Sequence, residues 1–171
     1  MKTGSGDKFA NMAVITVTES AANTLTFKKL ETGISIHDKV GWIINRVEYF
    51  LSELGLTQFA DNEDLAYWGL ACSNSFAAPS MTEETILDVN CLSKMEATDV
   101  GFFFQYRPFI KDFSTLPGGG LLVPPVPLYL WLKGTGLAGA GSVTCRMHYT
   151  LKELSVDEYW ELVEARRVIS S

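Results

Sequence analysis

Histidine and cysteine are scarce in this chain, which limits the metal and covalent chemistry that it can support. There are two histidines, His37 and His148, and neither H-x-H nor H-E-x-x-H occurs, so a cupin-type metal site is not expected. The three cysteines, Cys72, Cys91 and Cys145, are odd in number and far apart in apolar surroundings. They are expected to be small core residues in a reducing compartment, because disulfide frameworks and zinc sites need paired or clustered cysteines.

Positive charge is missing from a long central part of the chain. No Lys or Arg occurs between Arg46 and Lys94, and the net charge of the chain is −6. Affinity for nucleic acid depends mainly on basic side chains that neutralise phosphates, so direct nucleic-acid binding is not expected. The simplest interpretation is an acidic, solvent-exposed surface that aids solubility. Eight acidic residues lie in this stretch: Glu48, Glu53, Asp61, Glu63, Asp64, Glu83, Glu84 and Asp88.

Long hydrophobic runs are also missing. The longest apolar run, Leu121 to Leu132, is interrupted by three prolines and is too short to cross a bilayer, so no transmembrane segment is expected. Residues 1–12 have no apolar stretch of the kind found in secretory signals, and their Gly, Lys and Asp content is typical of a flexible N-terminal arm. The length of 171 residues suits one domain, predicted here as residues 13–171.

Most of the chain shows the period-two alternation of β-strands. Apolar Val143, Cys145 and Met147, for example, alternate with polar Thr144 and Arg146. Residues 40–54 also fit an amphipathic helix, but their aromatic and β-branched content and the strand-rich surroundings favour a strand. The eight predicted strands are 13–18, 24–30, 41–51, 65–73, 84–92, 99–107, 121–132 and 142–152. The strand 65–73 is expected to be buried on both faces.

A short helix is predicted at the C-terminal end. Ser155 and Glu158 have the spacing of a capping box, in which each side chain accepts a hydrogen bond from the backbone N–H of the other residue. Leu154 before the cap is expected to pack on Tyr159, and the later Arg166 and Arg167 suit the negative end of the helix dipole. The apolar stripe expected to pack against the sandwich or a neighbouring subunit is formed by Val156, Tyr159, Trp160 and Val163.

A glycine-rich segment, Lys133 to Gly141, contains the spacing G-x-G-x-x-G at Gly134, Gly136 and Gly139. This spacing is typical of dinucleotide-binding turns when a helix follows, because the helix N-terminus binds the phosphates. Here an alternating strand follows instead. The segment is therefore interpreted as the turn of an antiparallel hairpin, and no nucleotide cofactor is expected.

No combination of residues indicates an active site. Cys145 and His148 are three positions apart on one predicted strand, so their side chains are expected on opposite faces. The acidic run Asp61 to Asp64 lacks the alternating ligands and the glycine of a calcium loop and is interpreted as an acidic turn. The sequence also contains no G-x-S-x-G elbow. We therefore expect no catalytic, cofactor-binding or metal-binding residues, and no enzymatic activity.

The sequence resembles the single jelly-roll capsid proteins of icosahedral viruses. The likeness rests on the final predicted hairpin, PLYLWLKGTGLAGAGSVTCRMHYTLKEL, on the long loop before it, FSTLPGGGLLVPPVP, and on the short N-terminal arm. It implies an all-β, eight-stranded jelly-roll β-sandwich with a short C-terminal helix. It also implies a structural subunit of a viral capsid or virus-like shell, which self-assembles through loops and termini.

The same resemblance implies the partners and the location of the chain. Copies of itself and other capsid proteins are the expected partners, within a virion whose proteins are made in the host cytoplasm. Many such proteins have a basic N-terminal arm, whereas only Lys2 and Lys8 are present here, which argues against direct genome packaging. Two alternatives stay open. One is a β-sandwich module that binds carbohydrate or a protein partner through exposed Trp or Tyr, and the other is a hydrolase of unrecognised type on the same fold.

Overall fold

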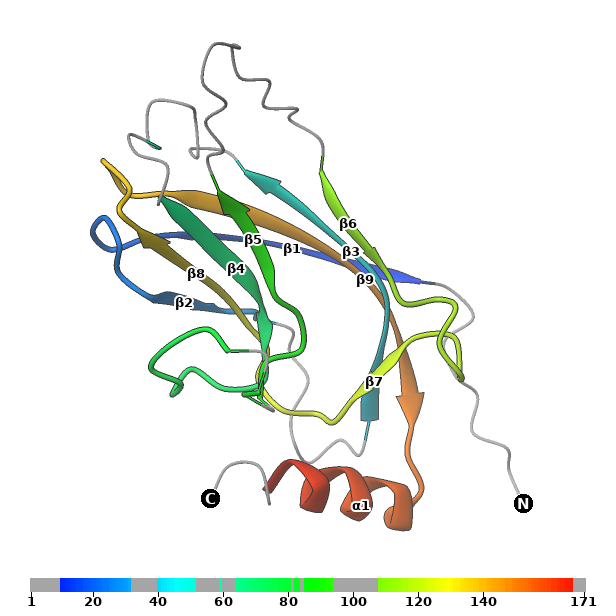
Figure 1. Ribbon diagram of the computed structural model, residues 1–171. Helices are drawn as coiled ribbons and strands as arrows, with labels where there is room; N and C mark the ends of the chain where they lie inside the picture. Colours follow the sequence, from blue (N-terminus) through cyan, green and yellow to red (C-terminus); the bar gives the residue numbers. More distant parts are fainter. Residues whose placement is uncertain are drawn as a thin grey trace.

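The computed structural model describes residues 10–31, 40–51, 59, 64–80, 82–83, 85–93 and 108–167. These residues form two antiparallel β-sheets that face each other, with one helix lying across one end of the sandwich (Figure 1). The all-β sandwich and the short C-terminal helix predicted from the sequence are confirmed. Within the described ranges, no helix combines the length and the apolar character needed to span a membrane.

The first sheet has the strand order β1-β9-β3-β6, and β7 pairs with β3 beside β6. The second sheet has the order β2-β8-β4-β5. Strand pairs are nested along the chain, because β1 pairs with β9, β2 with β8, β3 with β6 and β4 with β5. The strands are β1 (Asn11–Thr18), β2 (Thr26–Lys29), β3 (Val40–Leu51), β4 (Leu65–Ala71), β5 (Asn90–Ser93), β6 (Phe109–Asp112), β7 (Leu121–Val123), β8 (Tyr129–Thr135) and β9 (Ser142–Glu153).

The main hydrophobic core lies between the sheets, where alternate residues of each strand face inward. Val143, Cys145 and Met147 of β9 are all buried there. The second sheet is buried on its outer face as well, since Trp131 packs edge-on against Phe76 with ring centroids 5.6 Å apart. The strand predicted at residues 65–73 corresponds to β4. Its last four residues are all buried, which confirms for them the predicted burial on both faces.

β3 confirms the strand interpretation of residues that also fit a helix. Trp42 and Ile44 are buried before Asn45, whereas Val47 and Tyr49 are buried after it. The pairing register with β9 shifts at Asn45, which forms a β-bulge. This extra residue moves the buried positions from even to odd numbers. It therefore produces the helix-like spacing of apolar residues in the sequence.

The prediction of one continuous strand over residues 121–132 is wrong, because this range contains β7 and the first part of β8. Three prolines within it remove backbone donors, and the chain leaves one sheet for the other at this point. β7 pairs with β3 in the first sheet, whereas β8 pairs with β2 and β4 in the second. At the N-terminal end, β1 begins at Asn11, two residues before the predicted domain boundary at residue 13.

The predicted strand 84–92 is also largely wrong, because β5 begins only at Asn90. The residues before it cross over the end of β4, where the backbone N–H groups of Leu87 and Asp88 both donate to the Leu70 carbonyl at 2.8 and 3.3 Å. The predicted strand 99–107 lies outside the described residues. β6 was not predicted, so the described residues contain nine strands where the sequence predicted eight for the whole chain.

Gly69 of β4 lies directly beneath this crossing. A Cβ at Gly69 would overlap the backbone carbonyl oxygen of Asp88, which cannot move aside as a flexible side chain would. We expect Gly69→Ala to lower the free energy of unfolding by about 2–3 kcal/mol in urea denaturation, as overpacking does elsewhere. Gly118→Ala is the control, because that position has open space but a φ of 85°, and its expected loss is about 1 kcal/mol. Equal losses would contradict the close crossing.

Candidate functional site

The glycine-rich segment connects the two sheets. β9 follows it as predicted, but β8 pairs with β2 and β4, whereas β9 pairs with β1 and β3. The hairpin prediction is therefore wrong, because period-two alternation identifies a strand without identifying its neighbours. The element after Gly141 is nevertheless a strand, and a dinucleotide-binding turn needs a helix N-terminus there.

The carboxylate of Glu19 binds the backbone amides of this loop. Glu19 is only 4% exposed, and its two oxygens accept hydrogen bonds from the N–H groups of Gly134 and Gly141 at 2.6 and 2.9 Å. The Asn23 side chain both donates to the Leu137 carbonyl and accepts from the Leu137 N–H, at 2.9 and 2.8 Å. Amides that a phosphate would require are thus already bound by side chains of the same protein.

Gly136 is required at this loop for reasons of conformation and of space. Its φ is 78°, and a Cβ would overlap Oδ1 of Asp64. Asp64 itself is only 3% exposed. The rest of the predicted acidic turn, residues 61–63, lies outside the described residues.

We expect Glu19→Ala to lower the free energy of unfolding by about 3 kcal/mol, because the buried N–H groups of Gly134 and Gly141 lose their acceptor. Glu19→Gln should cost less, since its amide retains one accepting oxygen. Glu31→Ala, which removes a carboxylate side chain that is 82% exposed, is the control and should change stability by less than about 0.5 kcal/mol. Urea denaturation measures all three.

Because Glu19 already binds the backbone amides of the loop, we expect that the wild-type protein does not bind nucleotides. Calorimetric titration with NAD and with ATP should give no saturable heat. Saturable binding would contradict the finding that Glu19 already binds the loop amides if it is lost in Gly136→Val while circular dichroism shows that this variant keeps the fold.

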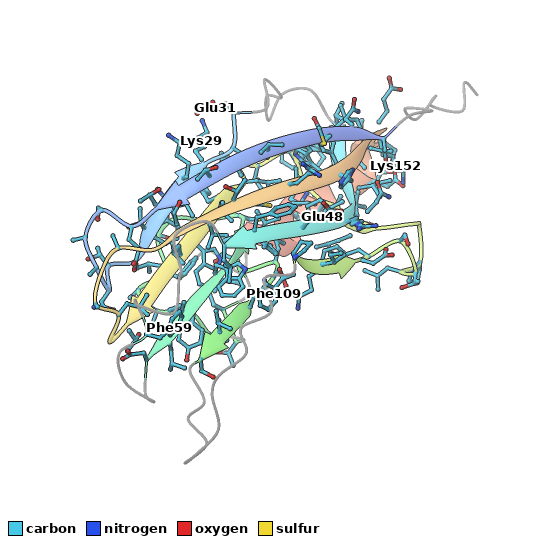
Figure 2. All side chains as sticks on the ribbon, turned by 90° about the horizontal axis from the view of Figure 1, so that it is seen from above. Lys29, Glu31, Glu48, Phe59, Phe109 and Lys152 are labelled. Carbon is cyan, nitrogen blue, oxygen red and sulfur yellow. The ribbon has the colours of Figure 1, made fainter. Side chains whose placement is uncertain are left out.

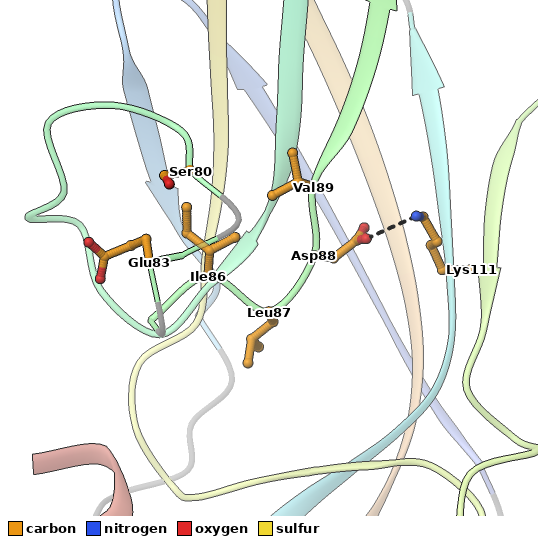
Figure 3. Close-up of a pocket in the computed structure, with 7 residues that line it drawn as sticks. All are labelled: Ser80, Glu83, Ile86, Leu87, Asp88, Val89 and Lys111. Atoms are coloured by element: carbon orange, nitrogen blue, oxygen red, sulfur yellow. Dashed lines mark ion pairs between the residues drawn. The ribbon is translucent and has the colours of Figure 1, made fainter. Parts of the chain in front are cut away.

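A cavity of about 150 Å³ lies beside the segment that leads into β5 (Figure 3). The Asp88 side chain in its wall is 6% exposed, and its Oδ1 lies 3.4 Å from Nζ of Lys111. Its Oδ2 accepts a hydrogen bond from the Asn90 amide at 2.8 Å. Because Lys111 belongs to the first sheet and Asn90 to the second, this polar group joins the sheets at their edge. The lining residues are Ser80, Glu83, Ile86, Leu87, Asp88, Val89 and Lys111.

Two further polar groups lie in the core on the inner side of Asp88. Burial, and then the charge of Asp88, raises the pKa of the Tyr49 hydroxyl well above its ordinary value. The same two causes raise the pKa of the Cys145 thiol. Both groups stay protonated near neutral pH, so neither is an activated nucleophile or base. The contacts of Asp88 with Lys111 and Asn90 pair the two sheets at this edge.

The residues considered for chemistry in the sequence are not brought together. Cys145 faces the core and His148 lies on the outer side of β9, as predicted, whereas His37 lies outside the described residues. Cys91 is exposed, which corrects the expectation that all three cysteines are core residues. In the ranges that the structure describes, no three His, Cys, Asp or Glu side chains are grouped closely enough to hold a metal ion.

Three of the acidic residues expected at the surface are enclosed. The Glu48 side chain, labelled in Figure 2, is 12% exposed and lies 2.8 Å from Arg46 and 3.5 Å from Arg146. Asp64 and Asp88 are also buried. The expectation of a solvent-exposed acidic stretch is wrong for these residues. The strands bring Arg146 to Glu48 and Lys111 to Asp88 from distant parts of the chain, which a local absence of Lys and Arg cannot reveal.

The C-terminal helix, α1 (Val156–Arg167), begins with the predicted capping box. Glu158 accepts a hydrogen bond from the Ser155 N–H at 2.9 Å, and the Ser155 hydroxyl accepts one from the Glu158 N–H at 3.2 Å. Tyr159 is buried, but Val156 and Trp160 are each 52% exposed. Trp160 therefore does not pack fully against its own sandwich, so packing against a neighbouring subunit stays a prediction, while Tyr159 is buried as predicted. The side chain of Val163 lies outside the described part of the helix.

Apolar side chains are exposed on α1 and on the outer face of the first sheet. Trp42, Trp68 and Trp131 are fully buried, so Trp160 is the one tryptophan of the four with an exposed side chain. On the first sheet, the exposed apolar residues are Met12, Val14, Phe50 and Ile110. No protein-family model and no curated protein matches this sequence.

The capping box predicts a pH dependence for α1. The backbone N–H of Ser155, and then Lys152, lowers the pKa of Glu158 from 4.5 to about 2. Because the folded-state pKa is depressed, this stabilisation is present above about pH 4.5 and is lost as the pH falls towards 2. An NMR titration of Glu158 should give a midpoint near 2 in the wild type and a higher one in Lys152→Met. A wild-type midpoint near 4.5 would contradict the capping box.

Proposed function

We propose that this chain is a structural subunit of a viral capsid or virus-like shell, folded as a jelly roll. With β7 set aside as an addition between β6 and β8, the remaining strands pair first with last, second with seventh, third with sixth and fourth with fifth. Such nesting results when one long antiparallel hairpin folds over into two sheets, which is the jelly-roll arrangement found in viral capsid domains. The nested pairing is the observation on which the proposal rests.

Other functions of jelly-roll domains have less support. A sugar-binding module needs exposed aromatic platforms, whereas three of the four tryptophans are fully buried. Tyr49 and Cys145 are buried and their pKa values are raised, which argues against a role for these two groups as nucleophile or base. These observations favour a protein that acts through its surfaces.

The exposed apolar side chains support assembly. Val156 and Trp160 lie one helical turn apart on α1 and expose about half of their surface. Exposed apolar groups of this kind mark protein contacts more often than scattered single residues do. In a closed symmetric shell each modest interface is repeated, so the subunit does not need one large hydrophobic contact.

The purified chain should form regular large particles as its concentration is raised, and sedimentation velocity and electron microscopy would detect them. Trp160→Ala should weaken this assembly while changing the free energy of unfolding by less than about 0.5 kcal/mol, because its side chain is half exposed. Glu161→Ala, an exposed neighbour on the same helix, is the control and should assemble like the wild type.

Two outcomes would overturn this proposal. One is a chain that stays monomeric at the highest attainable concentration. The other is a stable monomer that binds a defined glycan with a shift in Trp160 fluorescence, which would favour the carbohydrate-binding alternative.

A further inference from the structure

Four exposed apolar side chains lie on the outer face of the first sheet, in two pairs separated by polar and charged residues of β9 and β3. Met12 and Val14 of β1 are 59% and 55% exposed, and Phe50 of β3 and Ile110 of β6 are 36% and 47% exposed. A sheet face in contact with water normally carries polar side chains at its outward positions. These four residues, on three strands of one sheet, depart from that pattern.

The strand register places two of these residues at the ends of one row. Val14 is opposite Arg146, Arg146 is opposite Glu48, and Glu48 is opposite Ile110. All four alternate with inward-facing residues, so they share the outer face. With neighbouring strands about 4.8 Å apart, the row is about 14 Å long. Its order is apolar, positive, negative, apolar.

This order is complementary to itself. A two-fold axis parallel to the strands, between β9 and β3, would place Val14 of one copy against Ile110 of the other, and Arg146 against Glu48. The strands of the two facing sheets would then run in nearly the same direction, which is the aligned mode of sheet packing. We propose that the outer face of the first sheet is a two-fold contact between two copies of this chain. This inference rests on the proposed self-assembly and names the surface that mediates it.

The charged centre of the row is already ordered within one copy. Arg146 lies 3.5 Å from Glu48, and its guanidinium carbon lies 5.5 Å from the centre of the Phe50 ring. The Arg146 side chain is 44% exposed, whereas Glu48 is only 12% exposed beneath it. A contact formed by side chains already in position loses less conformational entropy on association. A second copy would place Arg146 of each copy against Glu48 of the other, and within each copy Glu48 also pairs with Arg46 at 2.8 Å.

Complementary variants test the contact. Val14→Glu and Ile110→Lys should each raise the dimer dissociation constant at least tenfold, because each variant places a charge against an apolar residue twice. An equimolar mixture should restore dimers, since one contact is then unchanged and the other pairs the two introduced charges. Leu116→Lys, at a position that is 41% exposed outside this face, is the control and should leave association unchanged. Sedimentation equilibrium below the particle-forming concentration measures each constant.

Chemical cross-linking tests the geometry. In the variant Val14→Cys/Ile110→Cys, with exposed Cys91 changed to Ser, a short bis-maleimide should join residue 14 of one copy to residue 110 of the other. A linker is needed because sheets packed face to face lie about 10 Å apart, whereas a direct disulfide needs Cα atoms within about 7 Å. Mass spectrometry of the cross-linked peptides identifies the pair. A cross-link between residue 14 of both copies, or failure of the mixed variants to associate, would overturn the two-fold arrangement.

The two proposals fail in different ways. Large particles that lack the 14–110 cross-link would overturn this contact and leave the shell proposal standing. Dimers that show the cross-link but never form particles would support the contact and overturn the shell proposal. A chain that is monomeric under all conditions would overturn both.

Discussion

The antiparallel pairing of β3 with β9 is the interaction on which the sandwich depends. These two strands pair along nearly their whole lengths, from Val40 opposite Glu153 to Leu51 opposite Val143. β1 pairs with the free edge of β9, and β6 and β7 pair with the free edge of β3. If β3 and β9 paired one residue out of register, the strand that moved would exchange its buried and exposed side chains.

The bulge at Asn45 lets one long strand serve two neighbours. The Asn45 carbonyl accepts a hydrogen bond from the Phe113 N–H at 2.8 Å, and its side-chain amide donates to the Gly119 carbonyl at 2.6 Å. The bulge is therefore fixed by the turn between β6 and β7, and both strands can pair with β3 on either side of it. Because the bulge changes which residues face inward, the core and the outer face both depend on this single asparagine.

The sequence predicted elements whose signals are local and missed those set by distant parts of the chain. The capping box of Ser155 and Glu158 and the alternation of β9 were correctly predicted, since each depends only on neighbouring residues. The change of sheet after β7 and the burial of Glu19 in the glycine loop depend on residues about 100 positions away. Glu19 shows this most clearly, because nothing near it in the sequence distinguishes it from a surface acid.

The two sheets differ in what covers their outer faces, and this difference bears on function. In the second sheet, Trp131 is covered by Phe76 of the segment that follows β4, so the chain supplies its own second hydrophobic cluster. In the first sheet, Val14 and Ile110 remain about half exposed on either side of a charge pair whose anion is largely covered. Apolar side chains contribute favourable free energy only when they leave water, so the second sheet gains this within one chain. For the first sheet the same gain requires another molecule, and the self-complementary order of the row is the reason that a second copy of the chain is proposed.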